Sequence, residues 1–167
     1  MRAPSSRTPH KGLFMNRRTF LASAVALPVA FAPARNQAQE QITHVDTKQG
    51  GIPLQSSVVK GKSLAAEGNS PGAKARVHFN GPTKQLAAVA TGMVTLEPGS
   101  RPHPPHRHPE EEFVIVASGT GEIEIDGIVT PVESGDVMYA EANVLHGIRN
   151  TGSTLMVFYF TKILAAS

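Results

Sequence analysis

Residues 99–119, GSRPHPPHRHPEEEFVIVASG, decide the fold, because a histidine-rich loop runs there directly into a β-branched segment. Side chains alternate between the two faces of a strand, so His106 and His108 are expected to point the same way. If the strand register resumes after Pro109, Glu112 joins them. Two imidazoles and a carboxylate on one face suit a divalent cation, provided that another strand adds the last ligand.

His146, far downstream, is the candidate for that last ligand. It follows Leu145 in an otherwise apolar segment, where an unpaired imidazole would be a costly buried polar group. The residues alone leave other interpretations open. The histidines beside the proline-rich loop are also typical of a solvated patch that binds metal adventitiously, and His146 of a hydrogen-bonded core histidine. The glutamates at residues 110–112 equally fit a solvated acidic turn.

Short strands separated by turns surround this stretch and predict an all-β sandwich or barrel. Asp126-Gly127 is typical of a tight hairpin turn. Upstream, residues 51–85 contain apolar fragments at 57–59 and 75–79, which predict one or two edge strands plus a loop. The strands expected downstream are residues 86–96, 112–116, 122–125, 128–130, 137–139, 144–149 and 155–161.

These features resemble the two motifs that describe the cupins, G-x5-H-x-H-x3/4-E-x6-G and G-x5-P-x-G-x2-H-x3-N. Four residues match the first motif at every interval: His106, His108, Glu112 and Gly119. Gly99 stands one residue further upstream than that motif requires. Gly135, His146 and Asn150 match the second motif, in which Glu141 and Asn143 replace the proline and the glycine. Since asparagine tolerates left-handed backbone, the turn at Asn143 is expected to be kept.

The resemblance covers residues 86–162 and implies an antiparallel double-stranded β-helix, a jelly-roll barrel with one motif pair (a monocupin). It also implies a mononuclear site for one divalent metal, whose ligands are His106, His108, Glu112 and His146. His103 lies outside the motifs and is expected to be a loop residue that at most supports a ligand. Tyr139 is expected in the strand core, Glu141 in a turn, and Arg107 on the surface because it alternates away from the ligands.

Cupins of this type include dioxygenases, decarboxylases, isomerases and lyases that act on small oxygen-rich organic molecules. The resemblance therefore implies a metal-dependent enzyme of one of these types, with a small-molecule substrate. The alternatives are a non-catalytic module that binds or senses a small ligand, and a metal-poor structural barrel that works through its oligomer interface. Small cupins are commonly dimers, and residues 51–85 are expected to extend a partner's sheet in a homodimer.

Residues 1–34 have the features of an export signal peptide, and all of their charged residues are basic. A short apolar run follows Arg17-Arg18 and ends at an A-x-A-like processing site, Ala32-Pro33-Ala34. Residues 16–21, NRRTFL, resemble the twin-arginine export signature and predict a periplasmic or secreted protein. An ordinary secretory signal and an uncleaved membrane anchor are the alternatives. Met15 directly precedes this stretch, so either Met1 or Met15 is the start, and polar residues 35–50 are expected to be a linker.

Composition narrows the remaining function classes. The chain has no cysteine, which excludes disulfides, thiolate nucleophiles and cysteine-based metal sites. Beyond residue 34 it is mildly acidic and has no basic stripe, so no nucleic-acid partner is expected. Manganese or iron is the favoured metal, because a twin-arginine substrate folds before export and can load its metal in the cytoplasm, where free copper and zinc are scarce. Nickel, zinc and copper are the alternatives.

Overall fold

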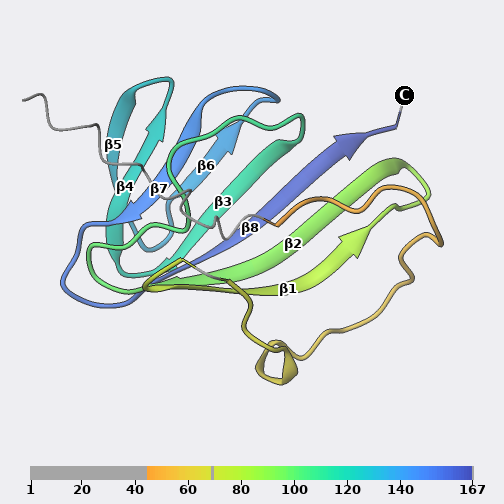
Figure 1. The fold of residues 1–167 in the computed structure, drawn as a ribbon, viewed down its shortest axis with the longest axis horizontal. Helices are drawn as coiled ribbons and strands as arrows, with labels where there is room; N and C mark the ends of the chain where they lie inside the picture. The colour runs from red at the N-terminus through yellow and green to blue at the C-terminus, as the bar shows by residue number, and fades with distance from the viewer. Residues whose placement is uncertain (1–44, 69, 167) are drawn as a thin grey trace, which may run out of the picture. The chain divides into compact units, whose positions relative to one another are not determined.

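The computed structural model describes residues 45–68 and 70–166, and almost all of their regular structure is β (Figure 1). The predicted export signal and most of the predicted linker lie outside these residues. One short 3-10 turn, η1 (Gly61–Ser63), precedes the strands. The strands are β1 (Ala73–Gly81), β2 (Leu86–Leu96), β3 (Glu111–Ser118), β4 (Thr120–Ile125), β5 (Ile128–Glu133), β6 (Val137–Ala140), β7 (His146–Asn150) and β8 (Met156–Ala165).

The strands form two antiparallel sheets, which confirms the all-β prediction. One sheet has the order β1-β2-β8-β3-β6 and the other β5-β4-β7. The order is non-sequential because β8 lies between β2 and β3, so the C-terminal strand joins the two halves of the larger sheet. Within the described residues, no helix is long and apolar enough to cross a membrane.

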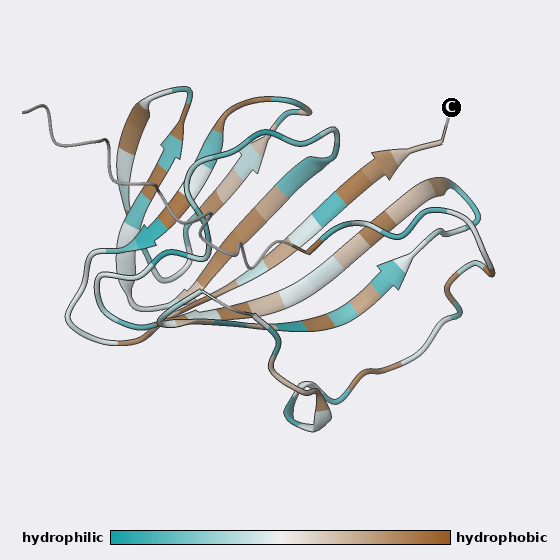
Figure 2. Ribbon diagram, in the orientation of Figure 1, coloured by the Kyte–Doolittle hydropathy of each residue, from teal (hydrophilic) through white to brown (hydrophobic). Residues whose placement is uncertain are grey.

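Alternation along β2, β3 and β8 contributes most of the core between the sheets. In β3, Val114 and Val116 are buried while Phe113 and Ile115 face outward. Figure 2 shows the matching hydrophobic bands along β2, β3 and β8. Buried side chains of both sheets form one cluster, which includes Leu96, Val114, Val116, Ile123, Ile148, Met156, Phe158 and Phe160.

The turns follow the sequence prediction closely. Asp126 and Gly127 adopt φ angles of 47° and 82°, and Ile125 pairs with Ile128 across the hairpin. Asn143 has a φ of 63°, so it adopts the left-handed conformation expected where the second motif has glycine.

Residues 75–79 lie within β1 at the edge of the larger sheet, so the structure contains one of the one or two upstream edge strands that the sequence predicts. Residues 57–59 form no strand, and Val58 is exposed. One local prediction is wrong: Tyr139 lies in β6 but points outward, since the alternation buries Met138 and Ala140 instead.

Asn150, the last residue of β7, fastens the loop that leads to the histidines. Its side chain is fully buried, and its Nδ2 donates to the carbonyl oxygens of Leu96 (3.0 Å) and Thr154 (2.8 Å). Its Oδ1 accepts from the Gly152 amide at 2.9 Å. The Asn150 amide also donates to the Ser100 carbonyl at 2.9 Å, which fixes the loop relative to β7.

Replacing Asn150 by alanine is expected to lower the free energy of unfolding by about 2–3 kcal/mol, because one buried and two partly buried hydrogen bonds to the backbone are lost. Chemical denaturation measures this loss. The matched control is Asn80→Ala, whose amide also bonds to two backbone groups but at an exposed position, where water replaces the lost bonds. Equal losses in the two variants would contradict the structural role of Asn150.

Candidate metal centre

The histidine loop is held against the start of β7 by backbone pairing. The amide of His106 donates to the carbonyl of His146, and the amide of His146 donates to the carbonyl of His106, both at 3.0 Å. One step along, the Asn143 amide donates to the His108 carbonyl at 2.8 Å. The loop therefore behaves as a short extra strand beside β7, which explains why alternation correctly predicts that His106 and His108 share a face.

This pairing brings together all four residues predicted as ligands. Candidate ligand nitrogens of His106, His108 and His146 all lie within 4.8 Å of one another. The Oε2 atom of Glu112 lies 3.0 Å from Nε2 of His108 and 2.9 Å from Nε2 of His146. His108, Glu112 and His146 are buried and His106 is half-buried, so water has little access to the cluster.

The hydrogen bonds on the far side of two rings fit a bound cation. Nδ1 of His146 lies 2.9 Å from the Val144 carbonyl, and Nδ1 of His108 lies 3.1 Å from the Glu110 carbonyl. A carbonyl only accepts, so these contacts place a ring proton on Nδ1 of both histidines. The two Nε2 atoms then face one carboxylate oxygen of Glu112, an arrangement that is favourable only when each Nε2 carries a proton, as a hydrogen-bond donor, or when a cation lies between them. The donor set thus suits a divalent metal.

Charge and burial act in opposite directions on the cluster. Burial alone would raise the pKa of Glu112, but hydrogen bonds from His108 and His146 and the charge of Lys162 hold that pKa far below its usual range. Burial would lower the pKa of His146, yet its hydrogen bond to Glu112 raises that pKa instead. Glu112 is therefore ionised, as a metal ligand must be.

Sequence reasoning missed the role of Glu110. Of the three consecutive glutamates only Glu111 is exposed, so the solvated-turn interpretation fails for Glu110. Oε2 of Glu110 lies 3.1 Å from Nδ1 of His108, and the Thr47 hydroxyl donates to its Oε1. The sequence does contain a signal for the buried position of Glu110. His108, Glu110 and Glu112 are spaced two residues apart, so their side chains are expected on the same face.

Lys162 was also missed, although its position in β8 indicates it. The inward positions of β8 are Met156, Phe158, Phe160 and then Lys162, which is only 4% exposed. Burial lowers the pKa of Lys162, while the charges of Glu112, Glu110 and Asp46 oppose that change. A lysine at an inward position of an apolar strand is the sequence signal for a buried cation.

The remaining polar residues lie around the cluster. The ring of His103 contacts that of His106 edge-on, with centroids 4.0 Å apart, so His103 is a loop residue beside a predicted ligand. Arg107 is exposed as predicted, and donates to the Asn143 carbonyl at 2.7 Å. Glu141 is exposed before the turn at Asn143.

Glu110→Gln is expected to weaken binding of a divalent metal about 10-fold, because groups that orient a ligand imidazole typically contribute that much to affinity. Titration with Mn²⁺ measures it. Glu111→Gln is the matched control, since this neighbouring glutamate is exposed and its replacement removes the same charge from the chain. If both variants lose affinity equally, net charge and not the contact to His108 is responsible.

Comparisons with known proteins concern the sequence and the fold of the chain. Residues 92–162 match the family model described as Cupin domain. The chain is 37% identical over 62 residues to Protein SchB of Streptomyces halstedii, and this match covers 36% of the chain and less than half, 44%, of SchB.

An RmlC-like cupin from Shewanella frigidimarina has a similar structure, with a TM-score of 0.56 and 18% identity over 70% of this chain and 97% of that one. A predicted oxalate decarboxylase from Thermotoga maritima has a TM-score of 0.53 and 25% identity over 65% of this chain and 99% of that one. Residues 92–162 are thus similar in sequence to a Cupin domain, and the antiparallel two-sheet fold of the described residues is similar to that of a solved cupin structure.

Proposed function

We propose that this chain is a metal-dependent enzyme that acts on a small oxygen-rich organic molecule. The observation that carries the proposal is the convergence of three imidazoles and the Glu112 carboxylate in the interior of the barrel. A divalent metal held by these four residues would supply a Lewis acid or an O₂-activating centre. Similarity to a predicted oxalate decarboxylase supports a small, oxygen-rich substrate.

The chain's own residues contribute orientation, charge and exclusion of water. Glu110 and its backbone carbonyl hold the ring of His108, and the Val144 carbonyl holds the ring of His146. Phe158 and Phe160 form an apolar wall beside Glu112. In such a dry surrounding, charges act more strongly on a bound molecule than they do in water.

The metal identity and the compartment belong to the same proposal. Manganese or iron fits export by the twin-arginine route, in which the chain binds its metal before leaving the cytoplasm. The supporting sequence, NRRTFL at residues 16–21, lies outside the residues that the structure describes. A periplasmic or secreted location follows from this route.

A homodimer is the proposed assembly. The outer face of the larger sheet carries exposed apolar and aromatic side chains on three adjacent strands, β8, β3 and β6. Exposed patches of this kind commonly mark interfaces. They are Phe113, Ile115, Val137, Tyr139 and Tyr159.

Tyr139→Lys is expected to shift the dimer to the monomer, because it places a charge on this exposed apolar face. Light scattering measures the molecular mass of the wild type and of the variant. A monomeric wild type contradicts this assembly.

Metal content tests the proposed function. Protein purified from its own host is expected to contain about one equivalent of manganese or iron, which is lost in His106→Ala and His146→Ala because each substitution removes one of the few donors. Mass spectrometry of the bound metal measures it. His78→Ala is the matched control, since His78 lies in β1 beside Tyr159 and outside the cluster.

Each possible metal content decides between the functions. A well-folded wild type with little metal would contradict the enzyme and leave a non-catalytic ligand-binding module. Copper or zinc in place of manganese or iron would overturn the link between the metal and the export route. If the His146→Ala variant keeps its metal, the metal site lies elsewhere in the protein.

Export has its own test. Replacing both Arg17 and Arg18 by lysine conserves charge but removes the guanidinium pair, so it is expected to block export by the twin-arginine route while an ordinary secretory signal tolerates it. Cell fractionation measures the exported share. Unchanged export of the double variant would favour the ordinary secretory signal.

A further inference from the structure

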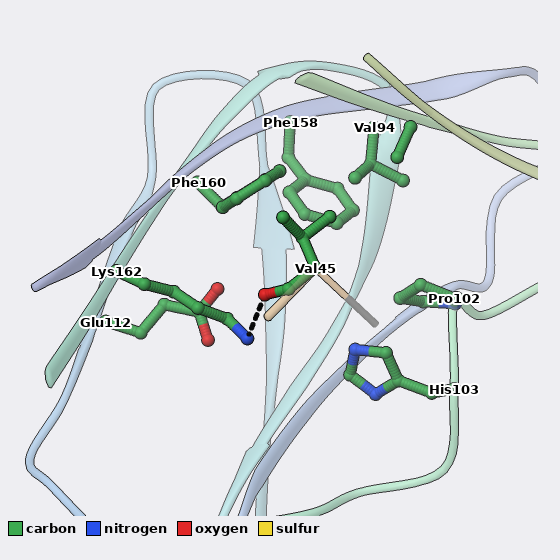
Figure 3. Close-up of a pocket in the computed structure, with 9 residues that line it drawn as sticks. Val45, Val94, Pro102, His103, Glu112, Phe158, Phe160 and Lys162 are labelled. Atoms are coloured by element: carbon green, nitrogen blue, oxygen red, sulfur yellow. Dashed lines mark hydrogen bonds between the residues drawn. The ribbon is translucent and has the colours of Figure 1, made fainter. Parts of the chain in front are cut away.

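A small, partly open pocket adjoins the candidate metal centre. Glu112, Lys162 and His103 line its polar side, while Phe158 and Phe160 line its apolar side (Figure 3). Its volume is about 30 Å³, which is enough for a water molecule but not for an organic ligand. Val45 lies in the middle of these residues, and its side chain packs against the core.

Residues 45–48, here called the N-terminal strap, hold Val45 in that position. The Val45 carbonyl accepts a hydrogen bond from Nζ of Lys162 at 3.1 Å. The Thr47 hydroxyl donates to Glu110. The strap is fastened outside the site by Asn80 of β1, which accepts from the Lys48 amide at 2.7 Å and donates to the Asp46 carbonyl at 2.8 Å.

The N-terminal strap therefore places an oxygen acceptor and a negative charge beside the buried ammonium group of Lys162. The Val45 carbonyl oxygen contacts the Lys162 ammonium, and the Asp46 carboxylate adds a favourable charge. A small carboxylate would offer the same two features, an oxygen acceptor and one negative charge. With a dication bound, Glu110, Glu112 and Lys162 leave one positive charge in excess, which a monoanion neutralises.

We propose that Lys162 binds the carboxylate of a small monoanionic ligand next to the metal centre, and that the ligand displaces the N-terminal strap from this position. The inference deepens the proposed function, on which it rests, by naming the substrate class. The strap occupies the ligand's place in this structure, and binding exchanges the Val45 carbonyl and the Asp46 charge for those of the ligand.

Displacement has a calculable effect on affinity. If only a fraction of the molecules has the strap open, the apparent dissociation constant is the intrinsic one divided by that fraction. Loosening the strap without touching the site must then tighten binding. Asn80 allows this, because its side chain contacts Asp46 and Lys48 through the backbone and contacts no residue of the cluster in the described hydrogen bonds.

The test is a titration of the protein, Mn²⁺-loaded and metal-free, with acetate and with acetamide, followed by calorimetry or NMR. Acetate is expected to bind at least about 10-fold more tightly than its neutral isostere, since a charge-assisted hydrogen bond is lost in acetamide. Lys162→Met is expected to remove that preference. Lys74→Met is the matched control, because Lys74 is an exposed lysine of β1.

Asn80→Ala is the second arm and is expected to raise the apparent affinity for acetate several-fold while Lys74→Met leaves it unchanged. Equal affinities for acetate and acetamide, an unchanged preference in Lys162→Met, or an unaltered affinity in Asn80→Ala would each overturn the inference. If Lys162→Met does not fold, two comparisons still test the inference: acetate against acetamide in the wild type, and the affinity of Asn80→Ala against that of the wild type. Failure of the wild type to bind Mn²⁺ contradicts the proposed function instead, so the two failures are distinguishable.

Discussion

A buried carboxylate is the constraint on which the interior of this barrel depends. Glu112 lies among apolar side chains of β3 and β8, where an isolated charge would be prohibitively costly. It stays ionised because Nε2 of His108, Nε2 of His146 and the Lys162 ammonium all act on it. Each of these partners comes from a different part of the chain, so the carboxylate needs the histidine loop, β7 and β8 in one arrangement. The fold and the candidate metal centre therefore depend on the same contacts.

The strand pattern and the four clustered residues could be predicted because both depend on local rules. Alternation and turn residues indicate the bounds of β2, residues 86–96, and the Asp126-Gly127 hairpin. The motif spacing identifies His106, His108, Glu112 and His146, which the structure brings together. Backbone pairing between His106 and His146 explains this success, since it extends the rule of alternation into a proline-rich loop.

What could not be predicted depends on contacts between distant segments. The outward orientation of Tyr139 is one case, because an aromatic residue in a short strand gives no indication of which face is buried. The parity of Glu110 indicates its inward face, but its contact with Thr47 could not be predicted, because Thr47 lies 63 residues away in the chain. Three of residues 45–48 are polar and all four fall within the predicted linker, yet this segment contacts the barrel through Lys162 and Asn80. No local pattern reports such partners.

The central claim is that Glu112 and three imidazoles form one metal-binding unit in the barrel interior. A crystal structure of the Mn²⁺-loaded protein, with anomalous diffraction recorded at the manganese edge, tests it most directly. We expect one anomalous peak bounded by His106, His108, Glu112 and His146, with Lys162 outside the coordination sphere. A peak at His103 or another exposed histidine, or no peak in a fully folded protein soaked in Mn²⁺, would contradict it.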